Sequence, residues 1–208
     1  MLAGLHLQRG VSLIELMVGI AVFATLVMLG LPSFTTWLQN SQIRTAADAI
    51  QNGLQVARGE AVRRNTNVRF QLTDTADNSC AIAAVDTNTT ATWVVSLDNP
   101  TGACATPAWN EEPVAPTVKR ILQVRPGTEG TRNAVVTANQ TSLIFNGLGR
   151  VTPVPAATIR INVSNPTGGA CATIATPAPM RCLRLEVSTG GQVRLCDPAF
   201  AATDPQGC

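Results

Sequence analysis

The amino-acid sequence predicts an α+β protein, in which one long membrane-spanning helix at the N-terminus leads into an antiparallel β-sheet domain. Three observations predict this class. Residues 16–31 form an apolar run without a charged side chain, helical periodicity continues to about residue 64, and a periodicity of two prevails after residue 65. The chain has 208 residues, which is enough for one membrane helix and one soluble domain of ordinary size.

This pattern divides the chain into four segments. Residues 1–10 form a short leader, residues 11–32 a transmembrane helix, residues 33–65 an amphipathic continuation of that helix, and residues 66–208 a β-rich globular domain. Only 13% of the residues are charged, a low share for a cytosolic domain. Thr, Asn, Ala, Pro and Gly fill the difference, which is typical of an exported or envelope protein.

Glu15 is the acidic residue at the start of the apolar run, and Arg9 and Gly10 stand shortly before it. A lone carboxylate at the edge of a membrane-length helix is expensive to keep, so we interpret Glu15 as functional. An ordinary secretory signal is cleaved after its apolar core, whereas Gly10 precedes the core here. Cleavage after Gly10 would retain the apolar segment and make Val11 the new N-terminus. The alternative is an ordinary signal anchor in which Glu15 has no function. It explains neither the presence of Gly10 nor the spacing between Gly10 and Glu15.

The segment after the membrane run has the pattern of an amphipathic helix. Apolar residues recur there at helical spacing, and we expect all of them to form the core against the sheet: Phe34, Trp37, Leu38, Ile43, Ala46, Ala47, Ile50, Leu54, Ala57 and Ala61. Gly30 and Pro32 predict a kink or a locally melted turn, since proline lacks the N–H that a helix needs. Gly53 and Gly59 weaken the helix and could admit a strand or a neighbouring subunit at close range.

Short alternating segments, separated by turn residues, predict the strands of the sheet domain. We expect strands at residues 68–72, 81–85, 93–97, 118–124, 134–137, 143–145, 158–163, 183–187 and 192–195. Residues 104–116 and 164–179 are expected to form long surface loops. Gly190 and Gly191 suit the tight turn of a terminal hairpin. Strands at this spacing after one long helix favour an antiparallel sheet wrapped on that helix.

Six cysteines are distributed over the sheet domain: Cys80, Cys104, Cys171, Cys182, Cys196 and Cys208. None belongs to a C-x-x-C pair, which argues against a zinc site or a redox motif. An even number at loop-like positions favours disulfides formed in an oxidising compartment. Six cysteines allow about 15 pairings, and the sequence leaves the choice open. The simplest choice pairs neighbours, 80 with 104, 171 with 182, and 196 with 208.

The sequence argues against an enzyme, a metal site and a bound cofactor. The one histidine, His6, lies in the leader, the one lysine is Lys119, and no phosphate-binding glycine loop or carboxylate pair stands out. The net charge of +2 is too small to predict nucleic-acid binding by itself. Four arginines cluster near the end of the helix and could form a binding face or a solvated helix end: Arg58, Arg63, Arg64 and Arg69.

The segment GVSLIELMV, residues 10–18, resembles the N-terminal signature of type IV pilins and type II secretion pseudopilins. Counting from Val11, Glu15 is the fifth residue and Pro32 the twenty-second, which matches the family pattern, whereas Val11 replaces the usual phenylalanine. The resemblance implies that a prepilin peptidase cleaves between Gly10 and Val11 and methylates the new amine of Val11. It also implies that Glu15 pairs with the Val11 ammonium of a neighbouring subunit, because a buried carboxylate is stable only when it is paired.

Residues 46–64 resemble the GspH/FimT branch of this family, whose helix ends in an Ala-Arg-x-Glu-Ala pattern, here residues 57–61, followed by basic residues. The resemblance implies a structural minor pilin that works at the tip of a type IV pilus or primes its assembly. The corresponding minor pseudopilin of a type II secretion system is the alternative and shares every motif. Both imply a bacterial inner-membrane protein with a periplasmic C-terminal domain. Implied partners are other pilins or pseudopilins, the prepilin peptidase, an inner-membrane assembly platform and, before assembly, membrane lipid.

A DNA receptor for natural transformation is the third function that the resemblance allows. FimT-like receptors carry a Gly-Arg-x-Arg motif in the last hairpin, whereas residues 191–194 read Gly-Gln-Val-Arg here. Arg181, Arg184 and Arg194 could still contact phosphates if they share one face. Arg184 and Glu186 alternate along one strand, however, which favours a mutually neutralised surface.

Overall fold

The computed structural model describes residues 12–76, 79–105 and 119–208, and in these ranges one long helix is followed by strands in two antiparallel sheets. The chain forms two compact units, Met1–Trp37 and Leu38–Cys208. The helix, α1, spans Leu13–Arg64, and a short 3-10 helix, η1, spans Pro166–Gly168. The strands are β1 (Val68–Leu72), β2 (Thr89–Thr90), β3 (Trp93–Ser96), β4 (Ile121–Arg125), β5 (Val135–Ala138), β6 (Ser142–Phe145), β7 (Ile159–Ser164), β8 (Leu183–Val187) and β9 (Val193–Cys196).

Helix α1 is continuous from Leu13 to Arg64, so the melted turn expected near Gly30 and Pro32 is absent from it. The helix ends in a Schellman motif, in which Asn65 adopts a positive φ of 49° and Thr66 N–H donates to Ala61 O at 3.2 Å. Asparagine tolerates this left-handed conformation better than most residues. The motif satisfies carbonyl groups that the helix end would otherwise leave without a partner, and it turns the chain directly into β1.

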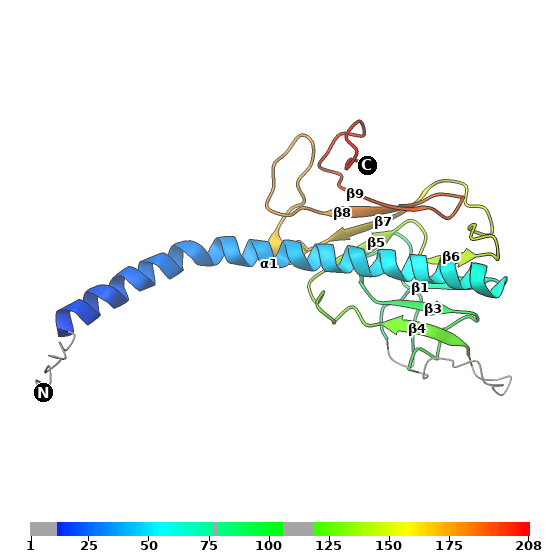
Figure 1. The fold of residues 1–208 in the computed structure, drawn as a ribbon, viewed down its shortest axis with the longest axis horizontal. Coiled ribbons are helices and arrows are strands. Elements are labelled where there is room, and N and C mark those ends of the chain that lie inside the picture. Colours follow the sequence, from blue (N-terminus) through cyan, green and yellow to red (C-terminus); the bar gives the residue numbers. More distant parts are fainter. Residues whose placement is uncertain (1–11, 77–78, 106–118) are drawn as a thin grey trace, which may run out of the picture. The chain divides into compact units, whose positions relative to one another are not determined.

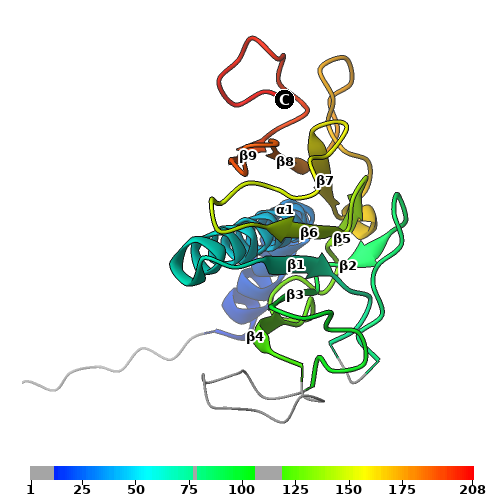
Figure 2. The same ribbon diagram turned by 90° about the vertical axis from the view of Figure 1, so that its right-hand side faces the viewer.

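The second half of α1 buries one stripe beneath the two sheets (Figures 1 and 2). The buried stripe contains Ile43, Ala46, Ala47, Ile50, Leu54, Ala57 and Ala61. The core prediction was wrong for Phe34, Trp37 and Leu38, which are 56%, 63% and 42% exposed. Phe34 and Trp37 instead stack on each other, with ring centroids 5.9 Å apart. Helical spacing alone therefore extended the predicted core by about two turns too many.

The strands form two sheets rather than the single wrapped sheet that the sequence favours. A four-stranded sheet has the order β4-β3-β1-β6, and a five-stranded sheet has the order β2-β5-β7-β8-β9. All ladders between these strands are antiparallel. Phe70, Trp93 and Phe145 from the first sheet and Ile159, Ile161 and Leu185 from the second enter one core with α1. One helix thus supplies the surface that both sheets need to bury their apolar faces.

The prediction of a strand at residues 81–85 was wrong. Ile82 makes only an isolated bridge with Thr73, and the next strand is the short β2. Cys80 and Asp86 adopt positive φ values of 42° and 55°, a conformation that interrupts an extended strand on both sides of the segment. Most of the loop predicted at residues 104–116 lies outside the described residues. The loop predicted at 164–179 contains η1 and a bridge between Cys171 and Met180.

The six cysteines form three disulfides between sequence neighbours, Cys80–Cys104, Cys171–Cys182 and Cys196–Cys208. This is the simplest of the pairings that the sequence allowed. The first disulfide lies in a small second core with Val94 and Ile121 on the outer side of the four-stranded sheet. The other two close a loop before β8 and the segment after β9. Each disulfide therefore fastens a surface segment to the strands next to it.

The two helical glycines form a matched pair for testing the core. A Cβ atom at Gly53 would lie 2.9 Å from ring carbons of both Phe70 and Trp93, whereas one at Gly59 would meet nothing within 4 Å. We expect Gly53→Ala to lower the free energy of unfolding by about 1–3 kcal/mol through overpacking. Gly59→Ala should raise it by about 0.5–1 kcal/mol, because alanine is the better helix former. Urea unfolding of the full chain in detergent, followed by near-ultraviolet circular dichroism, measures both, and equal effects would contradict the packing.

A salt bridge between Asp98 and Arg120 predicts how stability depends on pH. The Arg120 side chain donates from Nε and Nη2 to the Asp98 carboxylate at 2.9 and 2.8 Å. These bonds lower the pKa of Asp98 from 3.8 to about 2. The depressed pKa stabilises the fold above pH 4 and loses its effect as the pH falls through the range from 4 to 2. Because both side chains are partly exposed, we expect a loss of about 1 kcal/mol in urea unfolding experiments. Asp98→Asn should remove that part of the pH dependence.

Candidate functional site

The first turns of α1 expose an apolar surface. Every side chain from Ser12 to Leu31 is exposed, including Leu13 (78%), Met28 (78%) and Leu29 (80%). Within the described residues, α1 is the helix long and apolar enough to cross a membrane. Apolar area of this size is unfavourable in water, so the segment requires lipid or the apolar surfaces of other subunits around it.

Ser12 and Glu15 form a helix cap at the start of this segment. The Glu15 N–H donates to Ser12 Oγ at 3.3 Å, and the Leu16 N–H donates to Ser12 O at 3.1 Å. Serine followed by glutamate three residues later is the capping-box pattern. The S-x-x-E spacing of residues 12–15 is the sequence signal that indicates this role of Ser12. A carboxylate in the first turn also interacts favourably with the helix dipole.

The remaining predicted residues of the N-terminal site are described only in part. Gly10 and Val11 lie outside the described residues. Pro32 lies within α1, whose backbone is helical at that point. In the part of the chain that the structure describes, the Glu15 carboxylate has no ionic partner. Cleavage between Gly10 and Val11, methylation of Val11, and assembly through Glu15 and Pro32 therefore stay predictions.

The predicted terminal hairpin is formed by β8 and β9. Arg184 faces Cys196 and Glu186 faces Arg194 across the ladder, so Arg184 and Arg194 share the outer face of the sheet. Gly191 closes the turn with a φ of +78°. A Cβ atom at Gly191 would overlap the carbonyl oxygen of Gly149. The hairpin thus brings two of the three arginines proposed for DNA contact onto one face, while Arg181 precedes β8.

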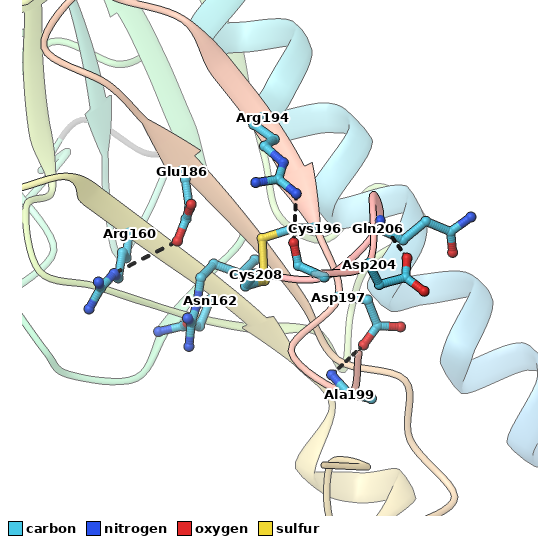
Figure 3. Close-up of a disulfide and its surroundings, with 12 residues drawn as sticks. Arg160, Asn162, Glu186, Arg194, Cys196, Asp197, Ala199, Asp204, Gln206 and Cys208 are labelled. Carbon is cyan, nitrogen blue, oxygen red and sulfur yellow. Dashed lines mark hydrogen bonds and ion pairs between the residues drawn. A yellow bond between two sulfur atoms is a disulfide. The ribbon is translucent and has the colours of Figure 1, made fainter. Parts of the chain in front are cut away.

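Arg194 and Arg181 both hold the segment that follows β9, and Figure 3 shows Arg194 beside the Cys196–Cys208 disulfide. Arg194 Nη2 donates to Gly207 O at 2.7 Å and to Pro205 O at 3.2 Å. Arg181 Nη2 contacts Asp197 Oδ2 at 2.6 Å, and its guanidinium lies 4.9 Å from the centroid of the Phe200 ring. These contacts act together with the Cys196–Cys208 disulfide, so both arginines have a structural role in fixing the C-terminal segment.

The other charged side chains of the outer face also have partners within the chain. Arg184 Nε donates to Asn162 Oδ1 at 2.7 Å. Glu186 lies 3.8 Å from Arg160, so its ionic partner is Arg160 and not Arg184 as the alternation suggested (Figure 3). No local sequence pattern indicates this role of Arg160, because only the pairing of β7 with β8 places Arg160 opposite Glu186. The face carries three arginines and one glutamate and remains basic.

The arginines at the end of α1 form a solvated and internally bonded helix end. Arg63 and Arg64 contact Glu60 at 2.8 and 2.7 Å, and the hydrogen bond from Arg63 is the main cause that lowers the pKa of Glu60. Arg58 Nε donates to Gly149 O at 3.2 Å, which ties the turn after β6 to the helix. Arg69, on β1, donates to Ser142 Oγ at 3.1 Å. These contacts tie all four arginines to neighbouring groups of the fold.

Arg194→Ala tests whether Arg194 serves the fold or DNA. If Arg194 holds the C-terminal segment, we expect the amides of Asp197 and Gly207 to exchange with solvent about fivefold faster, since one hydrogen bond contributes about 1 kcal/mol. Arg160→Ala is the control, because Arg160 shares the face but does not contact the segment. Hydrogen exchange and a DNA shift assay in low salt are measured for both variants. A DNA shift that Arg194→Ala abolishes without faster exchange would contradict the structural role.

Comparisons with known proteins agree with the features of this helix and domain. The family model for type II transport protein GspH matches residues 46–191, which is more than half of the chain, and a prokaryotic N-terminal methylation motif matches residues 5–31. None of the curated proteins matches.

Solved structures that resemble the chain are minor pilins and pseudopilins of low sequence identity. The type IV minor pilin FimU of Pseudomonas aeruginosa is 14% identical in two crystal forms, with TM-scores of 0.45 and 0.46. The alignments cover 77% and 78% of this chain and 98% and 93% of FimU. The minor pseudopilin EpsH of Vibrio cholerae is 12% identical with a TM-score of 0.39, over 77% of this chain and 99% of EpsH. On the strength of the family model, this chain belongs to the GspH family, and it is a minor pilin or pseudopilin with an N-terminal methylation motif.

Proposed function

We propose that this chain is a structural subunit that enters a pilin-type filament through α1, at the tip of a type IV pilus or in the priming of its assembly. The observation that carries the proposal is the exposed apolar surface of residues 12–31, in which Glu15 is the one charged residue. Lipid covers the apolar surface before assembly, and neighbouring helices cover it in the filament. The lone carboxylate prefers the filament, where a partner charge can meet it.

The processing and location follow from the same helix. A prepilin peptidase cuts between Gly10 and Val11 and methylates Val11, in agreement with the methylation motif at residues 5–31. The Val11 ammonium of one subunit then pairs with Glu15 of its neighbour and sets their axial register. The helix holds the subunit in the bacterial inner membrane, and the domain stands in the periplasm, where three disulfides can form. An inner-membrane assembly platform and other pilins complete the set of partners.

A minor pseudopilin of a type II secretion system is the second candidate function. The description of the family as type II transport proteins favours it. The same helix and the same pairing of Glu15 would then operate in a short periplasmic filament that moves folded proteins outward. DNA reception has weaker support, because Arg181, Arg184 and Arg194 already bind groups of their own chain.

Variants of Ser12 and Glu15 test the proposed pairing against the observed cap. Glutamine can take the place of glutamate in a capping box, so Glu15→Gln keeps the cap and removes only the charge. We expect this variant to lower incorporation into filaments by more than a hundredfold, since the loss of one partner of a buried ion pair costs about 3–5 kcal/mol. Ser12→Ala weakens the cap by about 1 kcal/mol and should leave incorporation nearly unchanged.

Both variants are placed in the native host in place of the chromosomal gene. Sheared surface pili are counted by electron microscopy, and the secreted proteins are profiled in the same strains. Loss of pili supports the pilus function, and loss of secretion with normal pili supports the pseudopilin function. Normal assembly of Glu15→Gln would overturn the pairing, because this variant removes the charge and keeps the cap, in which the Glu15 N–H donates to Ser12 Oγ.

A further inference from the structure

The last strand of the five-stranded sheet, β9 (Val193–Cys196), has no strand along its outer edge, whereas its continuation at Asp197 pairs there with Gly207 of the C-terminal segment. The sheet order places β8 on one side of β9 and no strand on the other (Figure 2). Natural proteins usually protect such edges with very short strands, proline, lysine or bulges. The opposite edge follows this rule, because β2 has only two residues. The four residues of β9 include neither proline nor lysine, and its pairing with β8 is regular.

Hydrogen-bond geometry shows which backbone groups face the open side. The Ser188 N–H donates to Gln192 O at 3.0 Å, which makes these two residues a hydrogen-bonded pair. Bonded and non-bonded pairs alternate along an antiparallel ladder. Val193 and Leu195, opposite Val187 and Leu185, therefore belong to non-bonded pairs and direct their N–H and C=O groups away from β8. Within the described ranges, these groups of Val193 and Leu195 have no hydrogen-bond partner.

A cavity of about 520 Å³ lies beside the end of this edge. It is formed where α1, the start of β8, the end of β9 and the C-terminal segment meet. Its lining includes Asn40, Arg44, Arg181, Leu183, Leu195 and Asp197. The volume is within the range of protein ligand sites. Leu183 and Leu195 are half-buried, so the cavity offers an apolar wall next to charged side chains.

The charges of this cavity do not cancel. Arg181 and Asp197 form an ion pair, and Asn40 accepts from Arg181 N–H and donates to Pro179 O. Arg44 is exposed, and it has no hydrogen-bond or ionic partner within residues 12–76, 79–105 and 119–208. One guanidinium is thus left over next to an apolar wall and an open strand edge. A carboxylate would fit it with two parallel hydrogen bonds.

We propose that the β9 edge and the Arg44 cavity together dock an extended, acidic segment of a neighbouring pilin or pseudopilin subunit. The segment adds to β9 as a further strand, bonding to the free groups of Val193 and Leu195. Its acidic side chain enters the cavity and pairs with Arg44. The inference rests on the proposed function only in that assembly supplies the neighbouring subunit. The proposed docking gives the domain a contact with the neighbouring subunit that does not involve residues 12–31 of α1.

Three peptides test the docking on the purified full chain in detergent, with ¹⁵N labelling. The first is acetyl-Ser-Thr-Val-Thr-Val-Glu-Ser-amide, the second carries glutamine in place of glutamate, and the third is the first with N-methyl groups on alternate residues. Strand addition requires peptide N–H groups, so N-methylation removes it and leaves the charge. We expect the first peptide, titrated into the millimolar range, to shift the amide signals of Val193 and Leu195 and slow their exchange with solvent. The N-methylated peptide should do neither.

Arg44→Gln and Arg132→Gln complete the test. Arg132 is an exposed arginine that borders the β2 edge of the same sheet, so its substitution removes one charge far from β9. We expect Arg44→Gln to weaken binding of the glutamate peptide about three- to fivefold, the range of a partly exposed ion pair. It should leave binding of the glutamine peptide unchanged, and Arg132→Gln should change neither.

Three outcomes would overturn the inference. The first is that the glutamate peptide leaves the signals of Val193 and Leu195 unmoved. The second is that the N-methylated peptide binds equally well, which excludes strand addition. The third is that Arg44→Gln and Arg132→Gln behave alike, which excludes the cavity charge. None of these measurements involves a filament, so they are independent of the result with Glu15→Gln.

Discussion

The whole structure depends on the burial of one stripe of α1 beneath two sheets. Ile43, Ile50 and Leu54 are fully buried, and the small residues of the same stripe, Ala46, Ala47, Ala57 and Ala61, let the strands approach closely. Gly53 allows the closest approach, with the rings of Phe70 and Trp93 packed against it. Without this stripe, the four-stranded and the five-stranded sheet would each expose an apolar face to water. The turns and disulfides could not stabilise the sheets in place of that core.

The two parts of α1 therefore require different surroundings. The segment of residues 12–31 is apolar on all sides and requires lipid or other helices, whereas the segment of residues 43–61 is apolar on one side and is covered by its own domain. A helix that is uniformly apolar cannot hide its surface in a small sheet domain, and a one-sided helix is unsuited to lipid. The change of pattern along a single helix is what allows one chain to be both a membrane anchor and a folded domain.

Elements with strong local patterns were predictable from the sequence. The helix, β1, β8 and the terminal turn at Gly191 each have a clear periodicity or turn signal, and the N-terminal signature around Glu15 indicated the family. The errors arose where a neighbour in space decides the outcome. Phe34 and Trp37 have core-like spacing but are exposed, and the segment after Cys80 alternates but is flanked by two positive φ values. The roles of Arg194 and Arg160 depend on the C-terminal segment and on strand register, which no local pattern contains.

The positions of the disulfides have a mechanical consequence. The three bonds span 24, 11 and 12 residues, and none of them joins α1 to a strand. A tensile load that enters the domain along α1 therefore reaches the sheets through the contacts of the helical stripe and through the peptide link to β1, and no disulfide bypasses these contacts. The packing of the helical stripe must therefore resist such a load without a covalent crosslink between α1 and the strands.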